Sequence, residues 1–293
     1  VLLDNSKLDL PTFDAAYNAR IQDCTVDIGA YEYNGAYDIT PDLISVAGQA
    51  IYYLTQNGRG HASANSTENA ACATKLQKVL DAAERYIYEH SKDENFPDQI
   101  IVKLAGDYDK ASDKNTEFVY TPLNSTVDDD ANATGEEVAS TYSIIVPRGV
   151  ELWGGYTDDY TSAYDNGFYT KTTTTTAEGT TTTYTDNRDV MKHHTVLSGE
   201  FVKDELTVNA YHVVTFTDRV YDGENRPMTA TKGGTDYLSL AAHAGNRKAV
   251  VDGVFIEGGM AVGESNSATK DIDRYGGAAV VTDYAHVRNC IIR

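Results

Sequence analysis

The sequence predicts an all-β chain that folds as a parallel β-helix, a solenoid in which each coil adds one short strand to the strand before it. Two segments of the same apolar pattern, residues 251–256 and 287–292, lie 36 positions apart. A polar stretch at 263–275 separates them and is predicted to be a loop inserted into one coil. Internal periods of about 20–50 residues are typical of solenoids, whose insertions map to outer loops. The later periodic segments are short strands without helices between them, which also favours a solenoid.

Turn-forming residues separate the first forty residues from the rest of the chain. Residues 1–40 are mostly extended or irregular in pattern, with one short alternating strand at 31–33. Asn34-Gly35 then predicts a turn, and Thr40-Pro41 predicts a further break. We therefore place a domain boundary here, with residues 1–40 as a separate segment and residues 41–293 as the β-helix.

One helix is predicted, from about Glu68 to Glu89. Its apolar residues are spaced so that they form one stripe along a helix. These residues are Leu76, Val79, Leu80, Ala83 and Ile87. Ser66 or Thr67 can cap the start of the helix. Because a β-helix leaves an unpaired strand edge at its first coil, we expect this helix to cover that edge.

Short strands are predicted along the remainder of the chain. They fall at 51–54, 100–104, 143–146, 150–153, 195–197, 211–216, 237–240, 250–256, 278–281 and 287–292. Two polar insertions interrupt the series, an acidic one at 107–140 and one at 157–192 that contains runs of threonine. The β-branched threonines can form a hairpin arm, but such low complexity equally allows no regular structure.

The two repeated strands also predict which side chains face inward. Val254 and Ile256 share parity with Cys290 and Ile292, so these four should point into the core. Phe255 and Ile291 should then take the opposite face. Asn289 occupies the position equivalent to Gly253, at a bend where asparagine tolerates a left-handed conformation.

The bulk composition excludes some classes of partner. The formal net charge is −20, which disfavours nucleic acid and anionic membranes as partners. No run approaches the roughly 20 apolar residues of a membrane span. The three cysteines, Cys24, Cys72 and Cys290, follow no metal-binding spacing. Their odd number argues against a disulfide framework, so we interpret them as small buried hydrophobic residues.

Few residues are candidates for catalysis or ligand binding. Asp252, Asp283 and Arg288 lie on or beside the repeated strands and can face one groove, but the sequence favours the alternative that they are solvated polar positions on a strand. Trp153 and Tyr156 can form a platform for a sugar ring, or can pack under a neighbouring segment.

Metal binding has a similarly weak signal, and we expect no cofactor except a possible Ca²⁺ ion. Asp128, Asp130 and Asn132 have the spacing of an EF-hand loop, but alanines replace the glycine and the glutamate that such a loop needs. Asp107, Asp109 and Asp113 are a comparable acidic set, for which a solvated loop is the alternative. His193, His194 and His212 lack matching ligands.

An ordered series of short motifs resembles a known family. These are LQKVLDAA at 76–83, IVKLAGDY at 101–108, GVELWGGY at 149–156, TVLSG at 195–199, HVV at 212–214, VDGVFIEGGMA at 251–261, GGA at 276–278 and VRNCII at 287–292. The series resembles the N-terminal region of right-handed parallel β-helix proteins of Gram-negative bacterial surfaces. They are related to polymorphic outer-membrane proteins and share the pectin-lyase-like fold. The chain departs from the family in its two long insertions and in Ala279, where a third glycine is usual.

The resemblance extends the domain assignment. Residues 19–33 are similar to the segment that closes such helices, so residues 1–40 would be the C-terminal tail of a preceding β-helix unit plus a linker. The chain would then be a fragment of a larger modular protein, ending within a second unit.

The resemblance implies a non-catalytic protein of the bacterial cell surface, or a secreted one, that acts as an adhesin, stalk or scaffold. Its partner would be a glycan or a protein of a host or cell surface. The alternative is a carbohydrate-active β-helix, either a polysaccharide lyase or glycoside hydrolase or a carbohydrate-binding module. Lyases of this fold use an acidic cluster with Ca²⁺ and a basic proton abstractor, roles that would fall to Asp252, Asp283 and Arg288.

Overall fold

The fold is built from short strands and one long helix. The computed structural model describes residues 38–44, 47–109, 114–116, 118–122, 143–158, 167–203, 206–218, 240–261 and 277–293. The segment predicted at 1–40 therefore lies almost entirely outside the described residues. None of the helices in the described part is long and apolar enough to cross a membrane.

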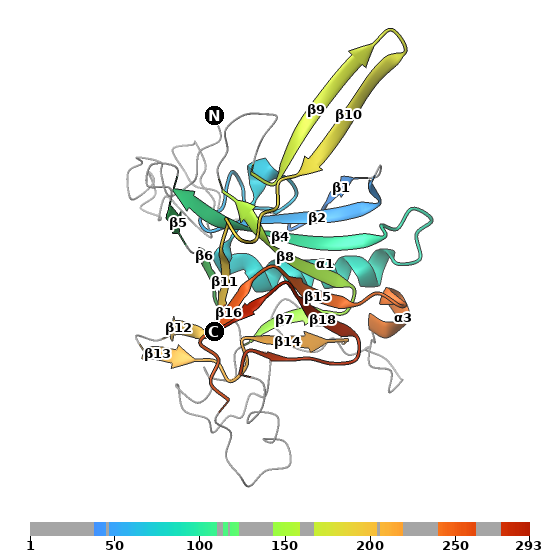
Figure 1. The fold of residues 1–293 in the computed structure, drawn as a ribbon. Coiled ribbons are helices and arrows are strands. Elements are labelled where there is room, and N and C mark those ends of the chain that lie inside the picture. Colours follow the sequence, from blue (N-terminus) through green and yellow to red (C-terminus); the bar gives the residue numbers. More distant parts are fainter. Residues whose placement is uncertain are drawn as a thin grey trace, which may run out of the picture.

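The largest sheet has eight strands, and most of its neighbours are parallel (Figure 1). Its main path is β1 (Asp42–Ile44), β2 (Gln49–Thr55), β4 (Gln99–Asp109), β8 (Val150–Thr157), β15 (Ala249–Asp252) and β18 (Ala285–Arg288). Two short strands lie off this path, β3 (Ala71–Cys72) beside β2 and β5 (Lys114–Thr116) beside β4. Only β1 and β5 run antiparallel to their neighbours.

Two smaller sheets are parallel throughout. One contains β6 (Phe118–Tyr120), β11 (Thr195–Ser198), β16 (Phe255–Glu257) and β19 (Ile291–Ile292). The other contains β7 (Ile144–Pro147), β14 (Val214–Thr217) and β17 (Ala279–Val280). The chain adds two antiparallel hairpins, β9 (Tyr169–Thr176) with β10 (Gly179–Asp186), and β12 (Glu200–Lys203) with β13 (Leu206–Asn209).

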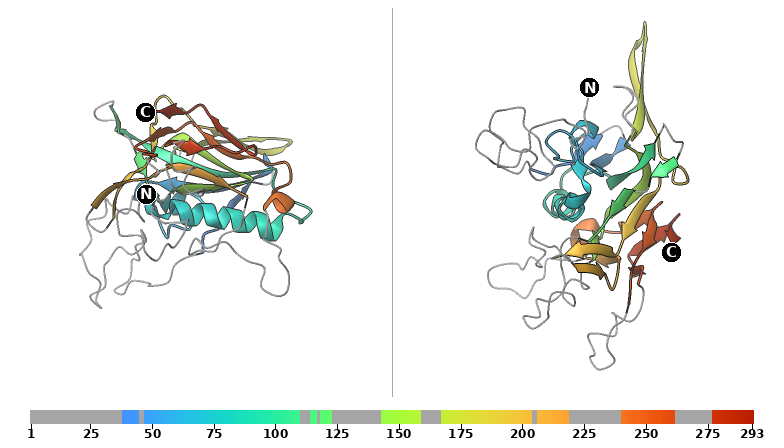
Figure 2. Two further views of the ribbon diagram at one scale, coloured as in Figure 1. Left: turned by 90° about the horizontal axis from the view of Figure 1, so that it is seen from below. Right: turned by 90° about the vertical axis from the view of Figure 1, so that its left-hand side faces the viewer.

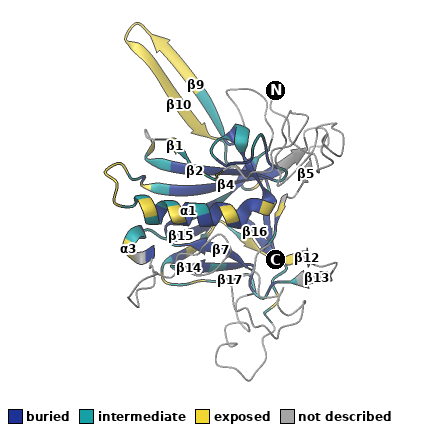
Figure 3. Ribbon diagram, turned by 180° about the vertical axis from the view of Figure 1, so that it is seen from behind, coloured by how far each residue is buried: buried dark blue, intermediate teal, exposed yellow. Residues whose placement is uncertain are grey.

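Helix α1 (Leu76–His90) packs into the core rather than over an end of the sheets. Its apolar stripe is fully buried, as the periodicity predicts. In Figure 3 the helix runs alongside β4, and it contacts β7 and the short helix α3 (Leu240–Ala244). The Gln77 amide fixes it to β7, donating to the Ile145 carbonyl at 3.2 Å and accepting from the Ile145 N–H at 2.9 Å. The sequence predicts that the helix covers the open edge of the first strand, but strand β1 pairs with the outer edge of β2.

The start of the predicted helix is wrong. Two 3-10 helices, Thr67–Asn69 and Ala73–Lys75, and strand β3 occupy the segment before Leu76. Ser66 does act as a cap, but of the first 3-10 helix, where its hydroxyl accepts from the Asn69 N–H at 3.2 Å. The strand predicted at 237–240 is also wrong where it is described, because Leu240 begins α3.

The predicted fold class is contradicted. The described residues form a mixed α/β fold of several, mostly parallel, sheets, and neither a solenoid nor the all-β right-handed parallel β-helix is found among them. The sequence periodicity identifies strand pairs but carries little information on how separate sheets and a helix pack together. Both helices contribute to the shared core, and both inserted hairpins are antiparallel.

The strand register deduced from the repeat is confirmed. Val251 pairs with Val287 and Phe255 pairs with Ile291, both in parallel, as the offset of 36 residues requires. Val254 and Ile256 are buried, whereas Ile292 is 63% exposed because its strand lies at the edge of its sheet. Gly253 and Asn289 both have a positive φ, 70° and 52°, in line with the expected bend.

The large sheet has one row of side chains facing the core and an adjacent row facing outward. Pairing aligns one inward row across five strands: Tyr52, Val102, Leu152, Val251 and Val287. The next residue of each strand points to the other face. That outward row is Tyr53, Lys103, Trp153, Asp252 and Arg288. It brings polar and aromatic side chains from distant parts of the sequence into one line.

The hairpin of β9 and β10 projects from this body as an arm (Figure 1). The views in Figure 2 show the same extension from two further directions. All eight residues of β10 are exposed, as are the last five of β9. The threonine runs of the second insertion therefore form a hairpin, one of the two outcomes that their composition allowed.

Candidate functional site: a polar network and groove on the outer face of the large sheet

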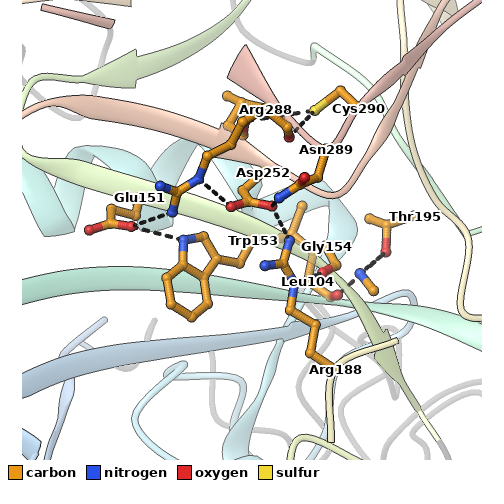
Figure 4. Close-up of polar contacts among 12 residues, drawn as sticks. Leu104, Glu151, Trp153, Gly154, Arg188, Thr195, Asp252, Arg288, Asn289 and Cys290 are labelled. Atoms are coloured by element: carbon orange, nitrogen blue, oxygen red, sulfur yellow. Dashed lines mark hydrogen bonds and ion pairs between the residues drawn. The ribbon is translucent and has the colours of Figure 1, made fainter. Parts of the chain in front are cut away.

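Asp252 is the centre of a polar network on the outward row (Figure 4). Its carboxylate accepts from Nη2 of Arg188 at 2.7 Å, from Nδ2 of Asn289 at 2.9 Å and from Nε of Arg288. Only 3% of the Asp252 side chain is exposed. Burial alone would raise the pKa of Asp252, but the hydrogen bonds from Arg188, Asn289 and Arg288 outweigh it and hold the pKa below the ordinary value.

Arg188 joins this network from the segment that follows the arm. Its Nε donates to the Gly154 carbonyl at 2.7 Å, and its guanidinium lies 5.2 Å from the centre of the Trp153 ring. Gly253 makes room for it, because a Cβ atom there would lie 2.2 Å from Nη2 of Arg188. Glycine is thus needed at this bend for two reasons: its φ is positive, and a side chain there would block the approach of Arg188.

Trp153 and Glu151 extend the network toward the other strands. Trp153 Nε1 donates to one Glu151 oxygen at 3.0 Å, and Arg288 lies 3.6 Å from that oxygen. The other Glu151 oxygen accepts from the Gln99 amide at 3.2 Å, and Gln99 accepts in turn from Gln49 at 2.9 Å. The chain of contacts therefore spans β2, β4, β8 and β18.

Lys103 forms a second, smaller cluster at the base of the arm. Its ammonium lies 3.3 Å from Asp186 and 4.7 Å from the centre of the Tyr156 ring. Burial lowers the pKa of Lys103, and the neighbouring Asp186 carboxylate opposes that shift. The Tyr156 hydroxyl donates to the same carboxylate at 3.1 Å. This cluster ties the end of β10 to the body.

A groove of about 250 Å³ lies beside the network on the same face. It is lined by Asp98, Gln99, Gly149, Glu151, Arg247, Lys248, Val250, His286 and Arg288. Arg247 donates to the carbonyls of Pro97, Asp98 and Ala244 at 3.0, 3.3 and 3.4 Å. Lys248 donates to the Asp283 carbonyl at 3.0 Å. Within the described part of the chain neither cation has a carboxylate partner. Together with Arg288, Asp98 and Glu151 the lining holds three cations and two carboxylates, a small positive excess in a strongly acidic protein.

The structure brings together some of the sequence-predicted residues and separates others. Asp252 and Arg288 are in direct contact, whereas Asp283 is an exposed residue of the loop before β18. Trp153 is half-buried, with Arg188 at its ring. Tyr156 is fully buried against Phe168, with ring centres 5.5 Å apart, so it packs in the core and is no sugar platform.

The predicted metal residues gain no support. Asp128, Asp130, Asn132 and Asp113 lie outside the described residues, and the side chains of Asp107 and Asp109 are not described. Among the residues that are described, no group of three or more His, Cys, Asp or Glu side chains is placed to hold a metal ion.

The interpretation of the cysteines needs one correction. Cys72 is disulfide-bonded, and its partner lies outside the described residues. Cys290 is a free thiol, and burial raises its pKa. An odd number of cysteines is compatible with one disulfide and one remaining thiol, which the argument from their number overlooked.

The disulfide predicts a thiol count that can be measured. Unfolding the chain without reductant should expose one reactive thiol out of three cysteines, and unfolding it with reductant should expose all three. Reduction should also lower the free energy of unfolding by about 2–4 kcal/mol, since a disulfide restricts the unfolded chain. Titration with a chromogenic disulfide reagent gives the count, and three thiols in the unreduced protein would contradict the bond.

No known protein family matches the chain, and no curated protein or solved structure shows significant similarity to it.

Proposed function

We propose that this chain is a non-catalytic binding scaffold of the bacterial cell surface, with the groove beside Glu151 as its ligand site. The observation that carries the proposal is the engagement of Asp252. Its carboxylate accepts from three donors, and its lowered pKa makes it a weak base. To ligate Ca²⁺ or to act as an acid or base, Asp252 would have to give up those bonds, and Arg288, the candidate proton abstractor, donates one of them. The network therefore favours a structural role over a catalytic one.

The disulfide at Cys72 supports an exported protein. Disulfides persist in oxidising compartments and are rare in the cytosol. The motif series that resembles bacterial surface proteins points the same way. A net charge of −20 suits a protein that stays soluble at an exposed surface.

The charges of the groove suggest the class of ligand. Arg247 and Lys248 hold positive charge without carboxylate partners among the described residues, and Gln99 and Glu151 offer groups that bond hydroxyls. A carboxylate-bearing glycan matches both features, because charge-assisted hydrogen bonds are stronger than neutral ones. A neutral glycan would leave the positive excess of the lining uncompensated.

The test measures turnover and binding on the same polymers. We expect polygalacturonate to bind more tightly than a neutral galactan, with an affinity that falls as salt increases. We also expect no release of reducing ends and no ultraviolet-absorbing unsaturated product, with or without Ca²⁺. Product formation that Asp252→Ala abolishes would overturn the proposal in favour of a carbohydrate-active enzyme.

A matched pair of variants locates the binding site. Lys248→Gln should weaken binding of polygalacturonate about tenfold, since one charge-assisted hydrogen bond contributes about 1.5–3 kcal/mol. Lys171→Gln removes the same charge from the arm, away from the groove, and should leave the affinity within about twofold. Equal losses in the two variants would mean that net charge, rather than the groove, determines binding.

A further inference from the structure

The arm of β9 and β10 has an open strand edge along its whole length. Among the described residues the two strands form a sheet of their own, and all eight residues of β10 are exposed. Figure 3 shows the exposed strands extending away from the body. The outer backbone edge of β10 therefore presents N–H and C=O groups with no strand beside them, which is a template for pairing with another strand.

The sequence of the arm lacks the features that normally protect such an edge. Residues 179–185 read GTTTTYT, with no charge and no proline. Proteins usually guard open edges with lysine, proline, bulges or short strands. Segments of high β-propensity and low charge pair readily with copies of themselves. A two-stranded hairpin is also marginally stable by itself, so further strands would stabilise it.

The base of the arm is firmly held, which keeps the edge extended. Phe168 is fully buried between Tyr53 and Tyr156, at ring distances of 5.1 and 5.5 Å. Asp186 is bound by Lys103 and by the Tyr156 hydroxyl. The Asn187 N–H donates to the Phe168 carbonyl at 3.2 Å. Ordering the arm therefore does not have to accompany binding, which lowers the entropic cost of association.

We propose that the arm is an interaction surface for a second copy of this chain, through antiparallel pairing of β10 with β10 across a two-fold axis. A two-fold axis perpendicular to the sheet leaves each face of the arm on the same side in both copies. Residues whose side chains point to the same face therefore lie opposite each other. With the axis at Thr182, that residue faces its own copy, Thr181 faces Thr183, and Thr180 faces Tyr184. The pairs between Gly179 and Thr185 are all uncharged, and threonine and aromatic pairs across strands are stabilising. At each end of the ribbon Asp186 lies opposite Glu178, so this register carries one like-charge pair at either end.

Charge favours this surface over the rest of the molecule. Two chains of net charge −20 repel each other, but the arm has no charged residue between Lys171 and Asp186 except Glu178 at its tip. Antiparallel pairing places the two bodies at opposite ends of a ribbon about 27 Å long, at about 3.4 Å per residue. That separation exceeds the Debye length of about 10 Å at 0.1 M salt, so the repulsion is largely screened.

The first experiment measures self-association of the whole chain. Sedimentation velocity at concentrations up to about 1 mM should show a reversible monomer–dimer equilibrium. Thr182→Lys places two like charges about 5 Å apart in the dimer and should weaken it about fourfold at low salt. Added salt should restore part of that loss, which a misfolded arm would not show.

The matched control keeps the charge and moves it away from the paired edge. Thr174→Lys lies on β9, the strand farther from the two-fold axis, and should leave the dimer unchanged within about twofold. Two outcomes would overturn the proposal. One is a monomer at every concentration. The other is a loss in Thr174→Lys equal to or greater than that in Thr182→Lys.

A crosslink tests the register directly. In a Cys290→Ser background, Thr182→Cys brings two sulfurs together across the axis. Directly opposed residues of antiparallel strands have Cα atoms about 4.5–5.5 Å apart, within disulfide range. Mild oxidation should give a reducible dimer with Thr182→Cys and much less with Thr174→Cys. A greater yield with Thr174→Cys would place the contact on β9 and contradict the pairing proposed here.

Discussion

Replacing Asp252 by alanine should lower the free energy of unfolding by about 3 kcal/mol at neutral pH. Removing one partner of a buried ion pair costs about 3–5 kcal/mol, because the other charge stays behind. We expect the lower end of this range, because only one of the two arginines would be left as a buried, unpaired charge. Arg188 is largely buried, whereas Arg288 is half-exposed and can be solvated. Urea unfolding followed by circular dichroism measures the change.

The exposed aspartate Asp283 provides the control. Asp283→Ala removes the same charge from the loop before β18 without touching the network, and should change the stability by less than about 0.5 kcal/mol. Equal effects of the two substitutions would show that Asp252 acts through overall charge and not through its contacts with Arg188 and Arg288.

The contribution of Asp252 should depend on pH in one direction. Its pKa is lowered in the folded chain, so the folded state binds the proton less readily than the unfolded state. The stabilisation is therefore present above the ordinary aspartate value of 3.8 and is lost as pH falls through the folded pKa. The difference between the wild type and Asp252→Ala should shrink over that acidic range. A difference that grew on acidification would contradict the lowered pKa.

The sequence predicts the pairing of strands better than the arrangement of sheets. Val251 and Val287 occupy equivalent places in a repeated pattern, and a parallel register follows from that pattern alone. The same alignment brings Asp252 beside Arg288. Helix α1 shows the limit, because a buried apolar stripe looks the same in a helix that covers an end and in a helix that packs within a core.

The parts of the network that the sequence did not predict come from its insertions. Arg188 and Asp186 follow the threonine runs, where no periodic pattern relates them to the sheet, yet they contact Asp252 and Lys103. Gly253 carried a usable signal, since a glycine at a bend can also mark the close approach of another segment. The disulfide at Cys72 had no spacing rule to reveal it.

Leu80→Asp should prevent stable folding, with a loss of about 5 kcal/mol or more. Leu80 is fully buried in the stripe by which α1 packs against the sheets, and a carboxylate there would lack a partner. Leu80→Ala should lose about 2–5 kcal/mol through the cavity it leaves. Arg85→Ala, on the exposed side of the same helix, should change little because both residues favour helix.

The manner of the loss distinguishes two roles for α1. A helix that only covers a sheet edge could be disturbed while the sheets stay folded, and the variant would then aggregate through that edge with its near-ultraviolet circular dichroism intact. A helix that is part of the core should lose that signal together with the stability, in one cooperative transition. The Gln77 contacts with Ile145 and the burial of Leu80 favour the second outcome. A folded, aggregating Leu80→Asp protein with an unchanged melting temperature would instead assign α1 to the edge.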